Sequence, residues 1–254
     1  AQTILNYPKA YRVKTGVDGS VAWIERAGPV KRLLVARPPA YETVELVRYG
    51  DTGDRISIIG FDAKGGVVFR RGTAGFDPAH RPSGPPVDLQ VAREGFGTPR
   101  VLISDVSDGF AHGAISPDGR RLIYARGGDV YALDLSRPRR DAAKLFVTRG
   151  RIGALFFSPD GKRVAFQSDR SGFNRGKYTF IGVYDFDEDT ITYMEPGLGI
   201  DQDIAWSPDS QRLAFVRFGF EPRTWRFSYH REGAPFDVIV ADAATGAGKA
   251  VFSS

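Results

Sequence analysis

A Ser-Pro-Asp tripeptide occurs three times in this chain, and each copy precedes a similar run of apolar residues. The copies begin at Ser116, Ser158 and Ser207, and their aspartates stand 42 and then 49 residues apart. After each copy a basic residue introduces the apolar run, which reads Leu-Ile-Tyr, Val-Ala-Phe or Leu-Ala-Phe. Repeats of about 40–50 residues are typical of propellers and solenoids, so this spacing constrains the fold more than any other feature.

Each copy predicts a tight turn followed by a buried strand. Proline pre-sets the first corner of the turn, aspartate caps it with its side chain, and glycine supplies the positive φ that ends it. After the first turn, Leu122 and Tyr124 point to one face of the strand and Ile123 and Ala125 to the other. Because both faces are apolar, we expect the strand to lie between layers, as in a blade stacked on its neighbours.

The remaining copies depart from this pattern. Ser210 replaces the glycine in the third copy, so that turn has to accommodate a β-carbon. Two weaker copies lie upstream, at 17–24 and at 61–69, where Asp18 and Asp62 take the place of the repeated aspartate. A stretch rich in proline and glycine, 72–86, is interpreted as an inserted loop. The sequence therefore predicts about five repeat units.

A second short apolar strand follows the first in most units. The examples are Arg32–Ala36, Asp129–Leu133, Phe180–Tyr184 and Asp237–Ala241. Short strands at regular spacing, without helical periodicity, favour an all-β fold. We predict a β-propeller of four-stranded blades over residues 1–254, with about five blades. Since fewer than six blades rarely close a ring with this type of repeat, we expect an incomplete ring that is a segment of something longer.

Composition limits the remaining possibilities. At 254 residues and 42% hydrophobic content the chain has enough apolar side chains for a substantial core. No run approaches the roughly 20 apolar residues of a membrane helix, and the absence of cysteine excludes disulfides and thiolate chemistry. The chain starts Ala1-Gln2-Thr3, a start common after signal-peptide cleavage, although the boundary of a fragment would look the same. We expect a periplasmic or secreted protein.

The net charge of +5 does not point to nucleic acid. The densest basic cluster, 137–140, is followed at once by Asp141, and no basic stripe carries interleaved stacking aromatics. We therefore predict no nucleic-acid partner.

Residues for catalysis or metal binding are not evident. No Gly-x-Ser-x-Gly pentapeptide occurs, and Ser171 lies in a polar loop. His80, His112 and His230 fall in different repeats without ligand spacing, which argues against a metal site. The acidic run at 185–189 is interpreted as a solvated turn. The sequence predicts no catalytic residue, cofactor or metal in this chain.

One segment is unusual, the 18 residues 218–235 between two strands of one blade. It combines aromatic side chains with arginines, and long loops of that composition are usually functional. The candidate residues are Arg223, Trp225, Arg226, Tyr229 and His230. Contact with another domain or subunit is the favoured interpretation; contact with substrate and local packing are the others.

The repeats resemble those of TolB and of the prolyl oligopeptidase family. Three stretches favour the latter: 149–161 (RGRIGALFFSPDG), 166–172 (FQSDRSG, followed by FIGVYD) and 235–246 (PFDVIVADAATG). Their order is similar to that in the N-terminal propeller of bacterial dipeptidyl aminopeptidase and acylaminoacyl-peptidase-like enzymes. The resemblance is firm from about 100 to 252 and weaker before.

This resemblance implies a function. The family joins a propeller to a C-terminal α/β-hydrolase domain that carries the catalytic triad, and the propeller filters substrates by size. None of the triad positions exists in this chain, so no catalytic residue is carried over. The implied role is the non-catalytic propeller portion of an exported serine peptidase. Its partners would be the hydrolase domain and peptide substrates, and self-association is left open.

Two other functions remain to be distinguished. A stand-alone TolB-like propeller would serve as a protein-interaction scaffold. A small-molecule enzyme with its site on the propeller axis, like some lactonases, is less favoured because acids and histidines do not cluster.

Overall fold

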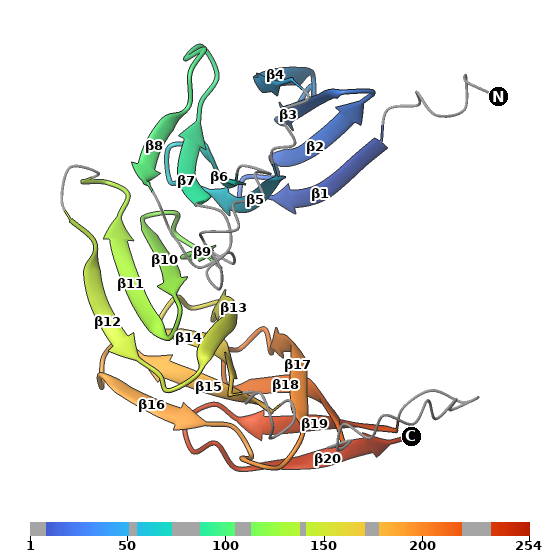
Figure 1. Cartoon of the computed structure of the whole chain (residues 1–254), viewed down its shortest axis with the longest axis vertical. Coiled ribbons are helices and arrows are strands. Elements are labelled where there is room, and N and C mark those ends of the chain that lie inside the picture. Colours follow the sequence, from blue (N-terminus) through green and yellow to red (C-terminus); the bar gives the residue numbers. More distant parts are fainter. Residues whose placement is uncertain are drawn as a thin grey trace, which may run out of the picture. The chain divides into compact units, whose positions relative to one another are not determined.

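The chain folds into strands that form successive four-stranded antiparallel sheets, which we call blades 1 to 5 (Figure 1). The computed structural model describes residues 9–50, 55–72, 87–104, 113–137, 141–170, 178–219 and 235–254. Throughout these ranges every regular element is a strand, twenty in all. The predicted all-β fold and the predicted number of repeat units are thus confirmed.

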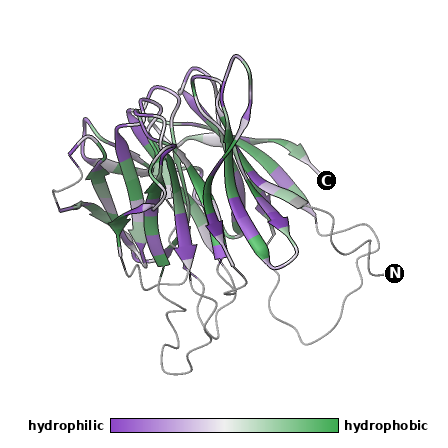
Figure 2. Ribbon diagram, turned by 90° about the horizontal axis from the view of Figure 1, so that it is seen from above, coloured by the Kyte–Doolittle hydropathy of each residue, from purple (hydrophilic) through white to green (hydrophobic). Residues whose placement is uncertain are grey.

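The chain divides into two compact units. Unit 1 comprises residues 1–126 and 132–143, and unit 2 comprises residues 127–131 and 144–254. Along both, hydrophobic residues concentrate in the strands (Figure 2). The ranges described above contain no helix with the length and apolar character needed to cross a bilayer.

Blades 1 and 2 belong to unit 1. Blade 1 consists of β1 (Lys9–Thr15), β2 (Val21–Ala27), β3 (Val30–Ala36) and β4 (Thr43–Tyr49). Blade 2 consists of β5 (Arg55–Phe61), β6 (Val67–Gly72), β7 (Val87–Ala92) and β8 (Arg100–Ile103). In both sheets the strands are neighbours in chain order. Their facing sides bury one hydrophobic core, whose members include Ala22, Ile24, Leu33, Val35, Ile56, Ile58, Val67 and Phe69.

Blade 3 consists of β9 (Gly113–Ile115), β10 (Arg121–Arg126), β11 (Asp129–Asp134) and β12 (Ala143–Val147). Its strands also pair in chain order. Leu122, Ile123, Tyr124 and Ala125 of β10 are all buried, as the apolar character of both faces predicted.

Blades 4 and 5 belong to unit 2. Blade 4 consists of β13 (Arg151–Phe157), β14 (Arg163–Asp169), β15 (Thr179–Asp185) and β16 (Thr190–Tyr193). Blade 5 consists of β17 (Ile200–Trp206), β18 (Arg212–Phe218), β19 (Phe236–Asp242) and β20 (Gly248–Ser253). A single parallel pair, Thr179 with Ile200, joins the two sheets. Their common core contains Ala165, Ile181, Val183, Met194, Leu213, Phe215, Ile239, Ala241 and Ala243.

The Ser-Pro-Asp turns join the first and second strands of blades 3, 4 and 5. In blade 3 the Ser116 hydroxyl donates to the Asp118 carboxylate at 2.5 Å and accepts the backbone N–H of Arg121 at 2.9 Å. The Ser116 N–H in turn donates to the Arg121 carbonyl at 2.9 Å. The same three contacts recur from Ser158 and from Ser207. The serine therefore closes the turn, while the aspartate fixes the serine.

The turns of blades 1 and 2 are one residue shorter, which corrects the upstream repeat alignment. In blade 1 the Gly16 N–H donates to the Ser20 carbonyl, and in blade 2 the Asp62 N–H donates to the Gly66 carbonyl. Asp62 thus occupies the position of the repeated serine rather than that of the repeated aspartate. Gly65, at φ 72°, takes the place of the turn glycine. The shorter loop explains why the pattern weakens upstream of blade 3.

Candidate functional site

The strand ladders are irregular in two places, in the first strands of blades 1, 2, 4 and 5 and between the third and fourth strands of blades 1, 2 and 5. A β-bulge inserts extra residues, bends the strand and re-aims a side chain, and such bulges are frequent next to active sites. In the first strands the register shifts lie between Tyr11 and Lys14 in β1, Ile58 and Gly60 in β5, Ile152 and Ala154 in β13, and Gln202 and Ala205 in β17. Among these irregularities, the bulges of β13 and β17 contribute residues to a cavity.

In unit 2 an open cavity of about 560 Å³ lies along the first strands of blades 4 and 5. Two carboxamides, one carboxylate, an aromatic ring and aliphatic side chains line it. The lining residues are Ala154, Phe156, Gln167, Gln202, Asp203 and Ile204. Phe156 is 41% exposed although it is a large hydrophobic residue. We call this cavity the inner crevice.

Hydrogen bonds fix the polar side of the inner crevice. Gln167 Nε2 donates to the Asp201 carbonyl at 2.6 Å, and Thr179 Oγ1 donates to the same oxygen at 2.7 Å. A Cβ at Gly153 would lie 2.6 Å from Gln167 Oε1, so a larger residue there would require this amide to shift. Asp203 lies in the β17 bulge at φ 58°, a left-handed conformation that non-glycine residues rarely adopt. The backbone that presents Asp203 is therefore an unusual one.

A buried ion pair holds β17 next to this bulge. Arg217 donates to both carboxylate oxygens of Asp201, at 2.7 and 2.9 Å, and to the Glu195 carbonyl at 2.6 Å. Burial raises the pKa of Asp201, and the hydrogen bonds from Arg217 oppose that rise. The Asp201 carboxylate raises the pKa of Arg217. Asp201 thus has two roles. Its side chain anchors β17 through Arg217, and its carbonyl positions the amide of Gln167.

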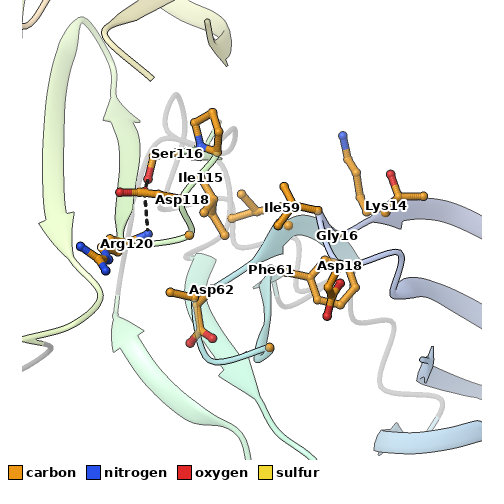
Figure 3. Close-up of a pocket in the computed structure, with 17 residues that line it drawn as sticks. Lys14, Gly16, Asp18, Ile59, Phe61, Asp62, Ile115, Ser116, Asp118 and Arg120 are labelled. Atoms are coloured by element: carbon orange, nitrogen blue, oxygen red, sulfur yellow. Dashed lines mark hydrogen bonds between the residues drawn. The ribbon is translucent and has the colours of Figure 1, made fainter. Parts of the chain in front are cut away.

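Unit 1 has a different pocket, of about 660 Å³, where the turns of blades 1, 2 and 3 meet. Figure 3 shows the carboxylates of Asp18, Asp62 and Asp118 around it, together with Lys14 and Arg120. Carboxylates around a pocket would suit acid–base chemistry if they were available for it.

The turns already use these carboxylates. Hydrogen bonds from the backbone and hydroxyl of Ser20 lower the pKa of Asp18. The Ser116 hydroxyl, followed by the Arg120 N–H, lowers the pKa of Asp118. Asp62 accepts the Gly66 N–H at 2.8 Å and pairs with Arg93. Low pKa values keep Asp18 and Asp118 ionised, and Asp62 is engaged by its own turn and by Arg93. The three carboxylates therefore cap turns rather than transfer protons.

The segment 218–235 connects β18 and β19, neighbouring strands of blade 5, as predicted. Aromatic rings pack together where the two strands meet this segment. The ring centroids of Phe218 and Phe236 are 5.9 Å apart, and those of Phe236 and Phe252 are 5.7 Å apart. The predicted site residues themselves lie outside the described residues. They are Arg223, Trp225, Arg226, Tyr229 and His230. Their role remains a prediction.

Ser171, His80 and His112 also lie outside the described residues. Within the part of the chain that the structure describes, no three histidine, cysteine, aspartate or glutamate side chains are placed to share a metal ion.

The sequence analysis missed Gln167, which a comparison of the repeats can find. In each blade, the carbonyl of one residue accepts the hydrogen bond that closes the turn between the first and second strands. Four residues after it, blades 1, 3 and 5 carry Ile24, Ala125 and Val216. Blades 2 and 4 carry Arg70 and Gln167 at this position. Polar side chains at a position that is otherwise apolar were the available signal.

Comparison with solved structures places the fold among propellers. The chain matches oligogalacturonate lyase from Vibrio parahaemolyticus with a TM-score of 0.63 at 10% identity, covering 96% of this chain and 65% of that one. It matches TolB from Acinetobacter baumannii with a TM-score of 0.54 at 19% identity, covering 95% and 55%. It matches the tricorn protease with a TM-score of 0.59 at 15% identity, covering 92% and 21%.

These identities establish similarity of fold, namely TolB-like propeller blades. The chain spans about half the length of the matched TolB and a fifth of the tricorn protease. No protein-family model matches the sequence.

Proposed function

We propose that this chain is the non-catalytic propeller portion of an exported serine peptidase, periplasmic or secreted. In this role it binds peptides and controls their access to an α/β-hydrolase domain encoded outside residues 1–254. Those residues form the propeller domain or a part of it, in a ring that further segments complete. The segment with Arg223, Trp225, Arg226, Tyr229 and His230 faces the hydrolase domain in this proposal.

The observation that carries the proposal is the inner crevice. A peptide backbone offers alternating N–H donors and carbonyl acceptors. A carboxamide both donates and accepts hydrogen bonds, so Gln167 and Gln202 match either group. Phe156 and Ile204 provide apolar surface for a side chain. Three polar and three apolar residues line the crevice, so it can meet both the backbone and a side chain of a peptide.

The comparisons support the proposal at the level of fold. The tricorn protease is a peptidase with a similar fold along part of its chain. The sequence order of the blades resembles that of prolyl oligopeptidase propellers.

The peptidase part of the proposal is tested on the protein purified from its natural source. Its intact mass should exceed the 27.8 kDa of this chain by that of a hydrolase domain. A fluorophosphonate probe should label a serine outside residues 1–254. A natural product of 27.8 kDa, or a larger one that the probe does not label, contradicts the proposal.

The binding part is tested with variants of the same protein. Removing one hydrogen-bonding side chain lowers affinity by about 1 kcal/mol, close to five- to tenfold. Gln167→Ala should therefore raise KM for a short peptide by about that factor with kcat little changed. Gln211→Ala, in the exposed turn of blade 5, is the matched control. Equal KM values for the two variants contradict a role for the inner crevice.

A second candidate function is a TolB-like interaction scaffold. The similarity to TolB along 95% of this chain favours it. In that case the inner crevice would take a segment of a protein partner, and the natural product would contain no serine that the probe labels. The same mass and labelling experiment therefore distinguishes the two functions.

A further inference from the structure

Three arginines of unit 1 lie on the first strands of blades 1 and 2 and on the second strand of blade 2. Arg12 comes from β1, Arg55 from β5 and Arg70 from β6. Arg70 occupies the blade position that carries isoleucine, alanine or valine in blades 1, 3 and 5. Partial burial of a guanidinium has a desolvation cost, so a charged residue is an uncommon choice at this position.

The strand register places two of these side chains on one face. Ser57 pairs with Arg70 across β5 and β6, so Arg55, two residues before Ser57, lies diagonal to Arg70. Diagonal neighbours on an antiparallel pair are within reach of long side chains. Arg12 lies in the bulge of β1, a strand that packs against β5, and has a φ of 59°. A third arginine therefore lies on a strand next to β5.

The electrostatics agree with this geometry. Burial lowers the pKa of Arg70, and the charges of Arg12 and Arg55 lower it further. Arg70 is therefore close enough to both Arg12 and Arg55 to feel their charges. A bound anion would be attracted by all three positive charges.

We propose that Arg12, Arg55 and Arg70 form an oxyanion site that takes a carboxylate of a peptide ligand. The inference rests on the proposed function for the identity of the ligand as a peptide. Arginine is suited to this role because its planar fork matches the two oxygens of a carboxylate. Each guanidinium carries five N–H donors, so contacts within the chain and a contact to a ligand are compatible.

The test is calorimetric titration of the chain with three short peptides. The first is acetyl-Gly-Phe-Glu-Gly-amide, the second replaces its glutamate with glutamine, and the third is the glutamine peptide with a free terminal carboxylate. Wild-type protein should bind at least one of the two acidic peptides about tenfold or more tightly than the neutral one, because hydrogen bonds to charged groups are the stronger class. The preferred peptide shows whether a side-chain or a terminal carboxylate is recognised.

The decisive variant is Arg12→Gln combined with Arg55→Gln. Both side chains are exposed, so the substitutions leave the core intact. The variant should bind the acidic and the neutral peptides alike. The control, Arg100→Gln combined with Arg137→Gln, also removes two positive charges from exposed positions and should keep the preference.

Three outcomes overturn the site: equal affinity of the wild type for all three peptides, no binding of any of them, or a preference that survives in the double variant. Failure here is distinguishable from failure of the proposed function. A protein that the fluorophosphonate probe labels but that shows no acidic preference retains the function and loses only this site.

Discussion

Ser210 offers a direct test of how neighbouring blades are joined. At the corner of the repeated turn, blades 1 to 4 carry glycines with φ between 70 and 81°. Blade 5 carries Ser210 there, at φ 62° and 1% exposed. Its hydroxyl accepts the backbone N–H of Asp160 at 3.0 Å, which links the turn of blade 5 to that of blade 4. The strained serine is thus retained for a hydrogen bond that glycine cannot make.

Two substitutions separate the strain from the hydrogen bond. Ser210→Ala keeps the left-handed strain and leaves the Asp160 N–H without its acceptor, which should lower the free energy of unfolding by about 1–3 kcal/mol. Ser210→Gly loses the same hydrogen bond but relieves strain of about 1–2 kcal/mol. The glycine variant should therefore be about 1 kcal/mol more stable than the alanine variant.

Equilibrium urea denaturation, followed by circular dichroism, measures these differences. The converse control is Gly119→Ser in blade 3, where a Cβ would lie 2.4 Å from the Ala63 backbone nitrogen. That variant should be less stable than the wild type because backbone atoms cannot move aside easily. The reasoning is refuted if Ser210→Ala is as stable as the wild type, or more stable than Ser210→Gly.

Three further perturbations test the packing and the charges. Gly182→Ala would place a Cβ 2.3 Å from the buried ring of Phe166 and should lower the free energy of unfolding by about 1–3 kcal/mol in urea titrations; an unchanged midpoint would be contrary evidence. Asp201→Asn leaves the Arg217 guanidinium, whose side chain is 13% exposed, without its counter-charge and should destabilise by about 3–5 kcal/mol in the same assay, so a change below 1 kcal/mol would disprove the importance of the pair. Because its pKa is depressed in the folded chain, Asp118 contributes stability that is present above the unfolded pKa of about 3.9 and is lost as the pH falls through the folded pKa. Stability measured from pH 6 to pH 2 should consequently fall less steeply for Asp118→Asn than for the wild type, and identical slopes would contradict this.

The blades could be predicted from sequence because their determinants are local. Serine, proline, aspartate and glycine act within a single turn, and the strand after it shows its buried faces directly. The shorter turn of blade 2 could not be recognised in the same way. From the sequence, Asp62 can be aligned either with the repeated aspartate or with the repeated serine. Only the hydrogen bond from its N–H to the Gly66 carbonyl decides for the serine position.

The candidate site was less accessible to sequence reasoning because it depends on contacts between blades. Gln167 reaches the carbonyl of Asp201 in the next blade, and Gly153 provides the space for its amide. Neither the hydrogen bond nor the space left by the glycine produces a recognisable motif in the sequence. The bulge that presents Asp203 is also invisible in the sequence, since a change in strand register is needed to define it.

The central claim is that the inner crevice of unit 2 binds peptide. Hydrogen–deuterium exchange of the chain, with and without a saturating neutral peptide, measures this most directly. The account predicts slower exchange in β13 and β17, the strands that contribute Phe156 and Asp203. Protection confined to other strands, or none under saturating peptide, would contradict it.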